Sequence, residues 1–329
     1  MTFLSTPLRI GRLLPLLAAS LLLSAASGAA LAQAAAFPSK PLRFIVPVGP
    51  GTNSDVLARW VAERTSKLLG TSAIVENKPG GDMLIAMQLF LQAPPDGHTV
   101  LMLSPTATII NPLMIKDLPY DAERDIRPVA GPMRSIAAFV VSADSKYKKF
   151  ADLVADAKAR PGAVSIAWYA QSYRIAIAGF ENEAKVKFNS IPYRTPTQVT
   201  TDMIGGTLDA TLTDFGGALQ LAKSGKIRVL AITSTERHPG MPEVPTVVES
   251  GFPNYTLYQI TGFGVHGKTP DDIAKKVEGA ILRVTASQEF KSYIEESGAQ
   301  AIALTGAQMA DSLSAERKRY REILKTIGN

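Results

Sequence analysis

Along the chain, short apolar runs alternate with longer segments whose apolar residues recur at helical spacing. The first apolar run, residues 42–46, leads through a Gly/Pro loop into a helical pattern that stops before Gly70. A second strand and helix are predicted within residues 72–92, and a third strand at 98–103. A strand–helix–strand–helix–strand order favours parallel pairing with right-handed crossovers, so this part of the chain is predicted to be an α/β unit.

A second α/β unit is predicted in the middle of the chain. The apolar run at 135–142 restarts the pattern, and further strands and helices follow it. The strands are expected at 164–167, 188–191, 210–213 and 227–233, and the helices at 150–159, 198–204 and 217–223. One more helix is expected to be opened by the loop 168–174.

The remainder of the chain is predicted to return to the first unit. A strand is expected at 257–265, and three helices at 270–286, 288–297 and 306–327. The last helix is amphipathic, and we expect it to pack on the first unit because a terminal helix needs docking to be ordered.

The N-terminal residues have the pattern of a secretory signal peptide. Arg9 and Arg12 precede an apolar core at 13–23, and small residues at 30–34 offer cleavage sites. We therefore exclude residues 1–32 from the fold and expect a soluble protein in the periplasm. A membrane anchor is the alternative, but the many small residues after the apolar core disfavour it.

Composition narrows the classes of function. The chain is 46% hydrophobic and 19% charged, which is typical of a globular protein, and it has no cysteine for disulfides or thiolate metal sites. Without the two arginines of the signal peptide, the formal net charge falls from +6 to +4. This small positive net charge slightly favours acidic ligands. The chain contains no dense run of basic residues of the kind that indicates nucleic-acid binding.

The loop between the first strand and first helix is a candidate anion site. A strand that enters a helix through glycines leaves backbone N–H groups unpaired at the positive end of the helix dipole. Thr52, Asn53 and Ser54 stand at this helix start, where they would either cap the helix or contact a ligand.

Short motifs occur in the loops at the ends of the predicted elements. They are Pro47-Val48-Gly49-Pro50-Gly51-Thr52-Asn53-Ser54-Asp55, Val75-Glu76-Asn77-Lys78-Pro79-Gly80-Gly81, Pro95-Asp96-Gly97-His98-Thr99, Asn111-Pro112, Leu118-Pro119-Tyr120-Asp121, Ile191-Pro192-Tyr193, Ile204-Gly205-Gly206 and Val244-Pro245-Thr246. In this order they resemble the motifs of the Bug proteins, extracytoplasmic substrate-binding receptors of tripartite tricarboxylate transporters. The resemblance covers nearly all of the chain after residue 32.

The resemblance implies a type II periplasmic-binding-protein fold of the α/β class, with two Rossmann-like lobes joined by two crossing strands. Lobe 1 would comprise residues 37–137 and 257–329, and lobe 2 residues 138–256. Such a receptor closes around a small di-/tricarboxylate or aromatic acid and catalyses no reaction. It needs no cofactor, and it delivers its ligand to membrane permease subunits. We expect a monomer that is not an enzyme.

The resemblance also implies which residues hold the ligand. They come from the loops after the first and third strands and from facing loops of lobe 2: Gly51, Thr52, Asn53, Asp55, Ser104, Thr106, Tyr193 and Asp214. Asp55 would repel an anion if it pointed inward, so we expect it at the helix start, holding the loop in shape.

One loop departs from the family pattern. Where relatives usually carry "SSGNGS", this chain has Trp168-Tyr169-Ala170-Gln171-Ser172-Tyr173-Arg174. Tyr169 and its aromatic neighbours would either narrow the pocket or pack within the lobe. Arg174 would either clamp a carboxylate or lie on a solvated helix face.

The strongest rival hypothesis is an NAD-dependent oxidoreductase. Gly49-x-Gly51-x-x-Ser54 is one residue short of the dinucleotide fingerprint, and Glu76 stands where a ribose-binding acid would sit. Ser54 in place of the third glycine, Pro50 in the turn and the export signal all disfavour it.

Two further kinds of chemistry are disfavoured. No hydrolase motif is present. His98, His238 and His266 are scattered without metal-ligand spacing, so we expect no metal site.

Overall fold

The computed structural model describes residues 2, 37–50 and 52–327. It divides into two units, Met1–Ser39 and Lys40–Asn329, and the second contains all the elements described below. Apart from Thr2, the expected signal peptide at 1–32 lies outside the described residues. Within the described chain, no helix combines the length and apolar character needed to cross a bilayer.

The first part of this unit is a parallel α/β arrangement, as the sequence predicts. The central strand β1 (Leu42–Val46) pairs in parallel with β2 (Ala73–Asn77) on one side and β3 (Thr99–Leu103) on the other. The helices α2 (Asn53–Leu68) and α3 (Leu84–Leu91) follow β1 and β2 in the chain. β1 and β3 are almost completely buried, which is typical of parallel strands covered on both faces.

The middle of the chain repeats this arrangement. The strand β5 (Ser165–Trp168) pairs in parallel with β6 (Asn189–Pro192) and β7 (Ala210–Asp214). The helices of this part are α5 (Phe150–Ala159), α6 (Gln171–Ala184), α7 (Pro196–Ile204) and α8 (Phe215–Lys223). The sheet order is β2-β1-β3-β9-β4-β7-β5-β6. It therefore has three parallel strands at each end, β2-β1-β3 and β7-β5-β6, and each group of three is called a parallel set below.

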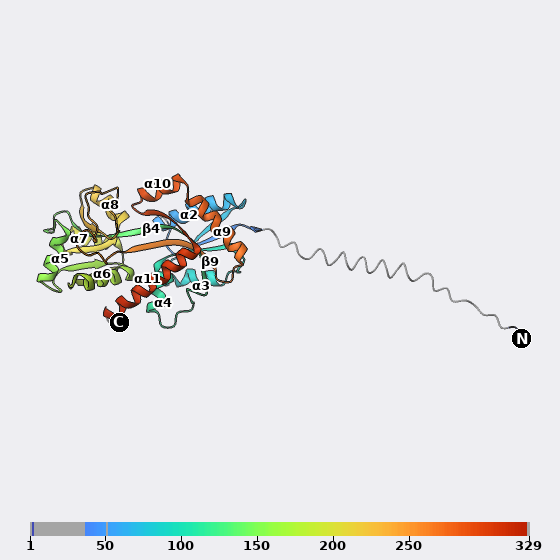
Figure 1. The fold of residues 1–329 in the computed structure, drawn as a ribbon, viewed down its shortest axis with the longest axis horizontal. Coiled ribbons are helices and arrows are strands. Elements are labelled where there is room, and N and C mark those ends of the chain that lie inside the picture. The colour runs from blue at the N-terminus through green and yellow to red at the C-terminus, as the bar shows by residue number, and fades with distance from the viewer. Residues whose placement is uncertain (1, 3–36, 51, 328–329) are drawn as a thin grey trace. The chain divides into compact units, whose positions relative to one another are not determined.

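Two long strands connect the parallel sets (Figure 1). The strand β4 (Ile126–Ser142) runs antiparallel to β9 (Tyr258–His266), pairing with it from Ile126 to Ile136. From Ala137 to Ser142, β4 pairs instead with β7 and β8 (Ile227–Ile232). One strand thus belongs to both halves of the sheet.

The sequence predicts only the second half of β4. Its first half contains Pro128, Gly131 and Pro132, which weaken any strand pattern, and the pairing with β9 slips near these residues. A partner supports this half from the other side, since β10 (Gln300–Thr305) pairs antiparallel with it. The sequence pattern also misses β10.

The start of the second helical segment differs from the prediction. By residue type and position Asp82 is a candidate N-cap for that helix, but it lies inside the short turn η2 (Gly81–Met83) with φ of 49°. Met83, with φ of 71°, precedes α3 without a side-chain capping bond. The left-handed backbone at both residues prevents a capping geometry, which requires extended φ and ψ at the cap.

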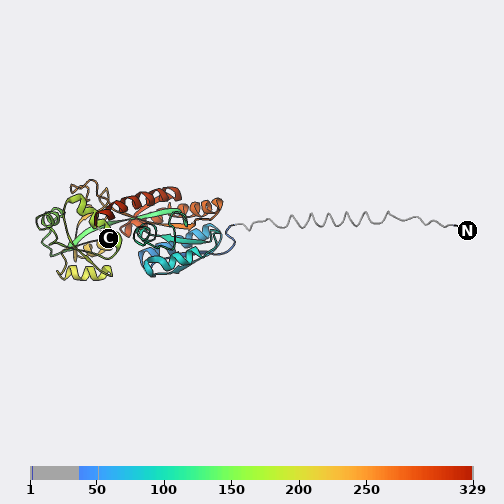
Figure 2. The ribbon, with the colours of Figure 1, turned by 90° about the horizontal axis from the view of Figure 1, so that it is seen from below.

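The C-terminal helices are α9 (Asp271–Thr285), α10 (Gln288–Glu296) and α11 (Gly306–Ile327). The last one contacts the π-helical turn η3 (Thr106–Ile110) as well as α6, so it spans both halves instead of packing on the first alone (Figure 2). Arg317 of α11 donates to the Thr108 carbonyl oxygen at 2.9 Å.

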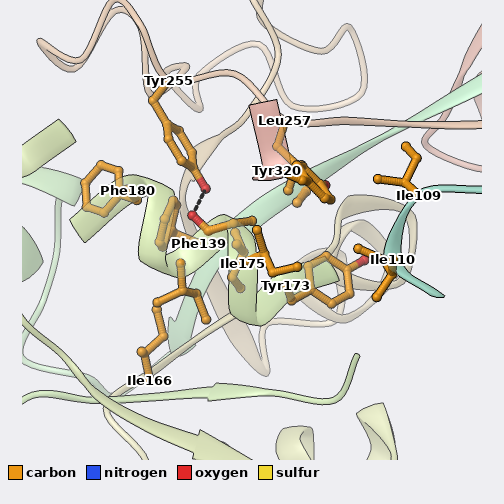
Figure 3. Close-up of a cluster of buried hydrophobic side chains, with 14 of the residues drawn as sticks. Ile109, Ile110, Phe139, Ile166, Tyr173, Ile175, Phe180, Tyr255, Leu257 and Tyr320 are labelled. Atoms are coloured by element: carbon orange, nitrogen blue, oxygen red, sulfur yellow. Dashed lines mark hydrogen bonds between the residues drawn. The ribbon is translucent and has the colours of Figure 1, made fainter. Parts of the chain in front are cut away.

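A large buried cluster extends across both halves of the sheet. Figure 3 shows Tyr173 of α6 beside Ile110 of η3, although the two elements belong to different parallel sets. Phe139 of β4 packs against the rings of Phe150 and Phe180, at centroid distances of 4.9 and 5.0 Å, and those two rings also contact each other at 5.4 Å. This packing fixes α6, whose first residues face the candidate site.

Candidate functional site

A cavity of about 490 Å³ lies between the two parallel sets. The loops after β1, β3, β5 and β7 contribute to it, as expected for ligand sites at the carboxyl ends of parallel strands. Its lining is rich in hydroxyl groups, and the polar residues are Thr52, Ser54, Ser104, Thr106, Ser135, Ser172, Asp214, Gln259, Thr261 and Ser297, with Tyr169 and Tyr173.

Half of the residues expected at the site line this cavity. They are Thr52, Ser104, Thr106, Tyr169 and Asp214. Gly51 and the side chain of Asn53 lie outside the described residues. Asp55, Arg174 and Tyr193 are placed elsewhere.

Thr52 both caps a helix and faces the cavity. Its hydroxyl oxygen accepts a hydrogen bond from the Asp55 N–H at 3.2 Å and donates one to the Gly49 carbonyl oxygen at 3.0 Å. Thr52 therefore caps α2 from a position on the cavity lining.

Asp55 does not line the cavity and stands at the helix start, as expected if it holds the loop in shape. It is buried, and its carboxylate accepts from Asn77 Nδ2 at 2.7 Å and from Arg59 Nε at 3.1 Å. Asn77 also donates to the Val48 carbonyl oxygen at 3.1 Å. Asp55 and Asn77 together tie the loop after β1 to the end of β2, so Asp55 holds the loop in shape.

Tyr193 does not line the cavity either, although Pro196, three residues further on at the start of α7, does. The Tyr193 hydroxyl donates to Asp202 Oδ2 at 2.7 Å, and this hydrogen bond raises the pKa of Tyr193.

Arg174 is also absent from the cavity lining, although its neighbours Ser172 and Tyr173 belong to it. The carboxylate clamp has no support in this geometry.

The aromatic loop contributes two pocket walls and one packing residue. Tyr169 and Tyr173 line the cavity with their ring centroids 5.1 Å apart, whereas Trp168 packs against the buried cluster. Burial, with Tyr169 and Asp214 nearby, raises the pKa of the Tyr173 hydroxyl.

Three helices begin at the cavity. The starts of α2, α6 and α8 contribute Ser54, Ser172 and Asp214 to its lining. The residue before α6, Ala170, has no side chain that can cap, so the first N–H groups of α6 lack a side-chain acceptor. These N–H groups and helix dipoles favour an anionic group.

Charged side chains are scarce at the site. Among the described lining residues, none is Lys, Arg or His, and Asp214 is the one carboxylate. Asp214 caps α8 by accepting from the Gly217 N–H at 3.3 Å, and burial raises the pKa of its carboxyl group.

The sequence prediction missed residues from the crossing strands and the C-terminal part. Gln259 and Thr261 alternate along β9 and so face the same side, which the period of two could have indicated. Gln259 Nε2 donates to Ser172 Oγ at 3.3 Å, a bond between the two halves. Ser297, Gly298 and Ala299 follow α10, and no local sequence signal places them here.

The acid expected by the dinucleotide hypothesis is already paired. Glu76 accepts from Arg43 Nε at 2.6 Å and from Arg43 Nη2 at 3.0 Å, and Lys78 also lies close to it. It does not line the cavity, and the oxidoreductase hypothesis gains no support from the structure.

Two parallel sets joined by crossing strands, with a hydroxyl-lined cavity between them, define the type II fold of periplasmic solute-binding receptors. The chain belongs to the family described as "Tripartite tricarboxylate transporter family receptor", whose sequence model matches residues 57–329. The resemblance seen in the motifs is thereby confirmed. The family and its fold imply a periplasmic location.

Relatives and solved structures agree with this membership. A UPF0065 protein of Bordetella bronchiseptica is 34% identical, over 90% of this chain and 88% of that protein. Protein BugT of Bordetella pertussis is 27% identical, over 91% and 93% of the two chains.

Two solved structures share the fold. An R. palustris protein solved with adipate has a TM-score of 0.78 and 25% identity, over 88% of this chain and 98% of that one. A structure described as a periplasmic transporter has a TM-score of 0.77 and 26% identity, with the same coverage.

Proposed function

We propose that this protein binds a small carboxylate in the cavity and delivers it to the membrane permease subunits of a tripartite tricarboxylate transporter. One observation carries the proposal: the N-termini of α2 and α6 and several hydroxyl groups line the same cavity, which has a volume of about 490 Å³. The R. palustris relative solved with adipate supports a carboxylate as the class of ligand.

Binding would be achieved by neutral donors. Backbone N–H groups at the helix starts and the hydroxyls of Thr52, Ser104 and Thr106 can solvate a carboxylate without a cationic side chain. No catalytic step is required for this function.

The two halves would act as lobes that close on the ligand. We assign residues 37–137 and 257–329 to lobe 1 and residues 138–256 to lobe 2, because β4 changes its pairing partners between Ile136 and Ala137. A ligand that contacts both lobes stabilises closure by its differential affinity for the closed form. We further propose export through the N-terminal signal peptide and a monomeric receptor.

The test is native mass spectrometry of the purified protein, followed by calorimetry with the acid that co-purifies. Thr52→Trp should abolish binding because the indole would fill the start of α2, whereas Val56→Trp, at an exposed position of the same helix, should bind normally. Equal binding by the Thr52→Trp variant and the wild type would refute the site. A co-purified dinucleotide would favour the oxidoreductase hypothesis instead.

A further inference from the structure

We propose that the free edge of β8 is a docking site for an extended acidic segment of a partner protein, which adds to the sheet as a further strand. The edge borders a second cavity, of about 780 Å³. Among the described residues, this second cavity shares no lining residue with the one between the parallel sets. The inference therefore concerns a different surface from the proposed ligand site.

β8 is paired along one side only. It pairs with β4 from Ile227 to Ile232, and in the described chain its other side carries a single bridge, from Ile232 to Thr246. At this bridge the Ile232 N–H donates to the Pro245 carbonyl oxygen at 3.0 Å. From Ile227 to Leu230 no described strand lies on that side, and an unpaired strand edge is a template for an added chain.

The unpaired edge faces the second cavity. Four consecutive residues of β8, 227–230, line it. Because successive side chains of a strand point to opposite faces, a run of four neighbours indicates that the cavity lies beside the backbone edge. The run spans about 10 Å, which matches about three residues of an added strand.

The second cavity also has an apolar floor. Phe150, Ile227, Val229 and Val244 line it and are buried except for small exposed fractions. An added strand directs every second side chain to the same face, so its alternate residues can pack on this floor. Backbone pairing would give affinity, and these contacts would fix the register.

The lining of the second cavity is basic. It contains four cationic side chains and one carboxylate, namely Lys148, Lys149, Arg228, Arg237 and Glu243. Arg228 and Lys148 donate to backbone carbonyl oxygens, at 2.7 and 2.8 Å, and such partners do not neutralise a positive charge. Arg237 pairs with Glu249 at 2.9 Å. The excess of positive charge favours acidic side chains on the added strand.

Charge and backbone together select the occupant. A second copy of this chain, pairing edge to edge, would bring the same cations together, and Lys residues at strand edges disfavour such pairing. A lipid headgroup could neutralise the cations but could not supply the alternating donors and acceptors that a strand edge pairs with. An acidic extended peptide satisfies both requirements.

The test uses fluorescein-labelled peptides and fluorescence anisotropy with the whole protein. The acidic probe is Glu-Val-Glu-Val-Glu-Val, and Lys-Val-Lys-Val-Lys-Val is its basic counterpart. The acidic peptide should bind at least about tenfold more tightly, and its affinity should fall as salt is added. A proline in place of the central valine should weaken binding, because proline has no N–H to pair with the edge.

Charge variants test the basic lining in both directions. Lys149→Glu should weaken the acidic peptide by at least about threefold, whereas Lys158→Glu, at an exposed position of the same helix outside the cavity, should not. Glu243→Gln should strengthen binding, because it removes the one carboxylate of the lining.

A steric variant tests the cavity itself. Ala151 is exposed at the start of α5 and lines the second cavity, so Ala151→Trp should block the peptide without disturbing the fold. Ala155→Trp is the matched control, because Ala155 is exposed on the same helix and does not line the cavity.

The outcomes separate this inference from the receptor function. Failure of the acidic peptide to bind, equal affinity for the acidic and basic peptides, or full binding by Ala151→Trp would overturn the docking proposal. Binding to phosphatidylglycerol vesicles without binding to the acidic peptide would also overturn it, in favour of a lipid surface. All these variants should keep wild-type affinity for the carboxylate ligand, so the receptor function stands or falls on its own test.

Discussion

Gly216, near the start of α8, lies against Gly298, in the turn after α10, with no side chain between the two backbones. A Cβ atom added at Gly298 would lie 2.7 Å from the Gly216 Cα atom, and one added at Gly216 would overlap the Ser297 carbonyl oxygen. Gly216 belongs to proposed lobe 2 and Gly298, which lines the cavity, to proposed lobe 1, so the two lobes touch at the edge of the cavity.

This contact predicts that a single methyl group hinders closure. Gly216→Ala should weaken ligand affinity by about tenfold or more, because overpacking at so close a contact typically costs about 1–3 kcal/mol. Small-angle scattering with saturating ligand should show a more open variant. Gly217→Ala is the control, since its Cβ would meet nothing within 4 Å and its backbone N–H is retained. Wild-type affinity in Gly216→Ala would show that the contact plays no part in closure.

Asn77 hydrogen-bonds to the loop after β1 and to Asp55, so we expect its removal to lower both ligand affinity and stability. Asn77→Ala removes donors to Asp55 Oδ1 and to the Val48 carbonyl oxygen, leaving a buried carboxylate with one partner fewer. We expect the free energy of unfolding to fall by about 1–3 kcal/mol in urea titrations. Affinity should fall as well, because the start of α2 would be less well held. Ser72→Ala, at the exposed position just before β2, should change neither quantity.

The raised pKa of Asp214 predicts how stability depends on pH. A carboxyl group with a higher pKa in the folded state binds more protons than in the unfolded chain, so it lowers stability as pH rises through the range between its unfolded and folded pKa values. Ligand-free Asp214→Asn should therefore melt higher than wild type at neutral pH and equally near pH 3, as differential scanning fluorimetry can show. Wild type and variant melting in parallel across that range would contradict the assignment.

The anchoring of α11 predicts that its central arginine matters for the whole fold. Arg317 is buried, donates to the Thr108 carbonyl oxygen at 2.9 and 3.3 Å, and pairs with Glu123. Arg317→Met should remove both guanidinium donors from that carbonyl and lower the free energy of unfolding by about 1–3 kcal/mol. Lys318→Met, at the exposed neighbouring position, provides the matched control. Equal stability of the two variants would mean that apolar packing alone docks α11.

Much of the site's scaffold follows from local sequence. The run 42–46, the glycines after it and Thr52 specify a strand, a turn and a capped helix through propensities that act over a few residues, and the structure has them at β1 and α2. Family motifs add the order of the elements and so the type II fold. Asp214 could be placed on the cavity for the same reason, because it ends a strand and opens a helix.

Only the tertiary structure decided which side chains meet. Tyr193 and Arg174 sit in loops and helix starts like those of Tyr169 and Asp214, yet neither lines the cavity. The first half of β4, broken by Pro128 and Pro132, becomes a strand because β9 and β10 hydrogen-bond to it from both sides. Gly298 reaches the site from far along the chain. Such contacts depend on long-range packing, which no window of neighbouring residues contains.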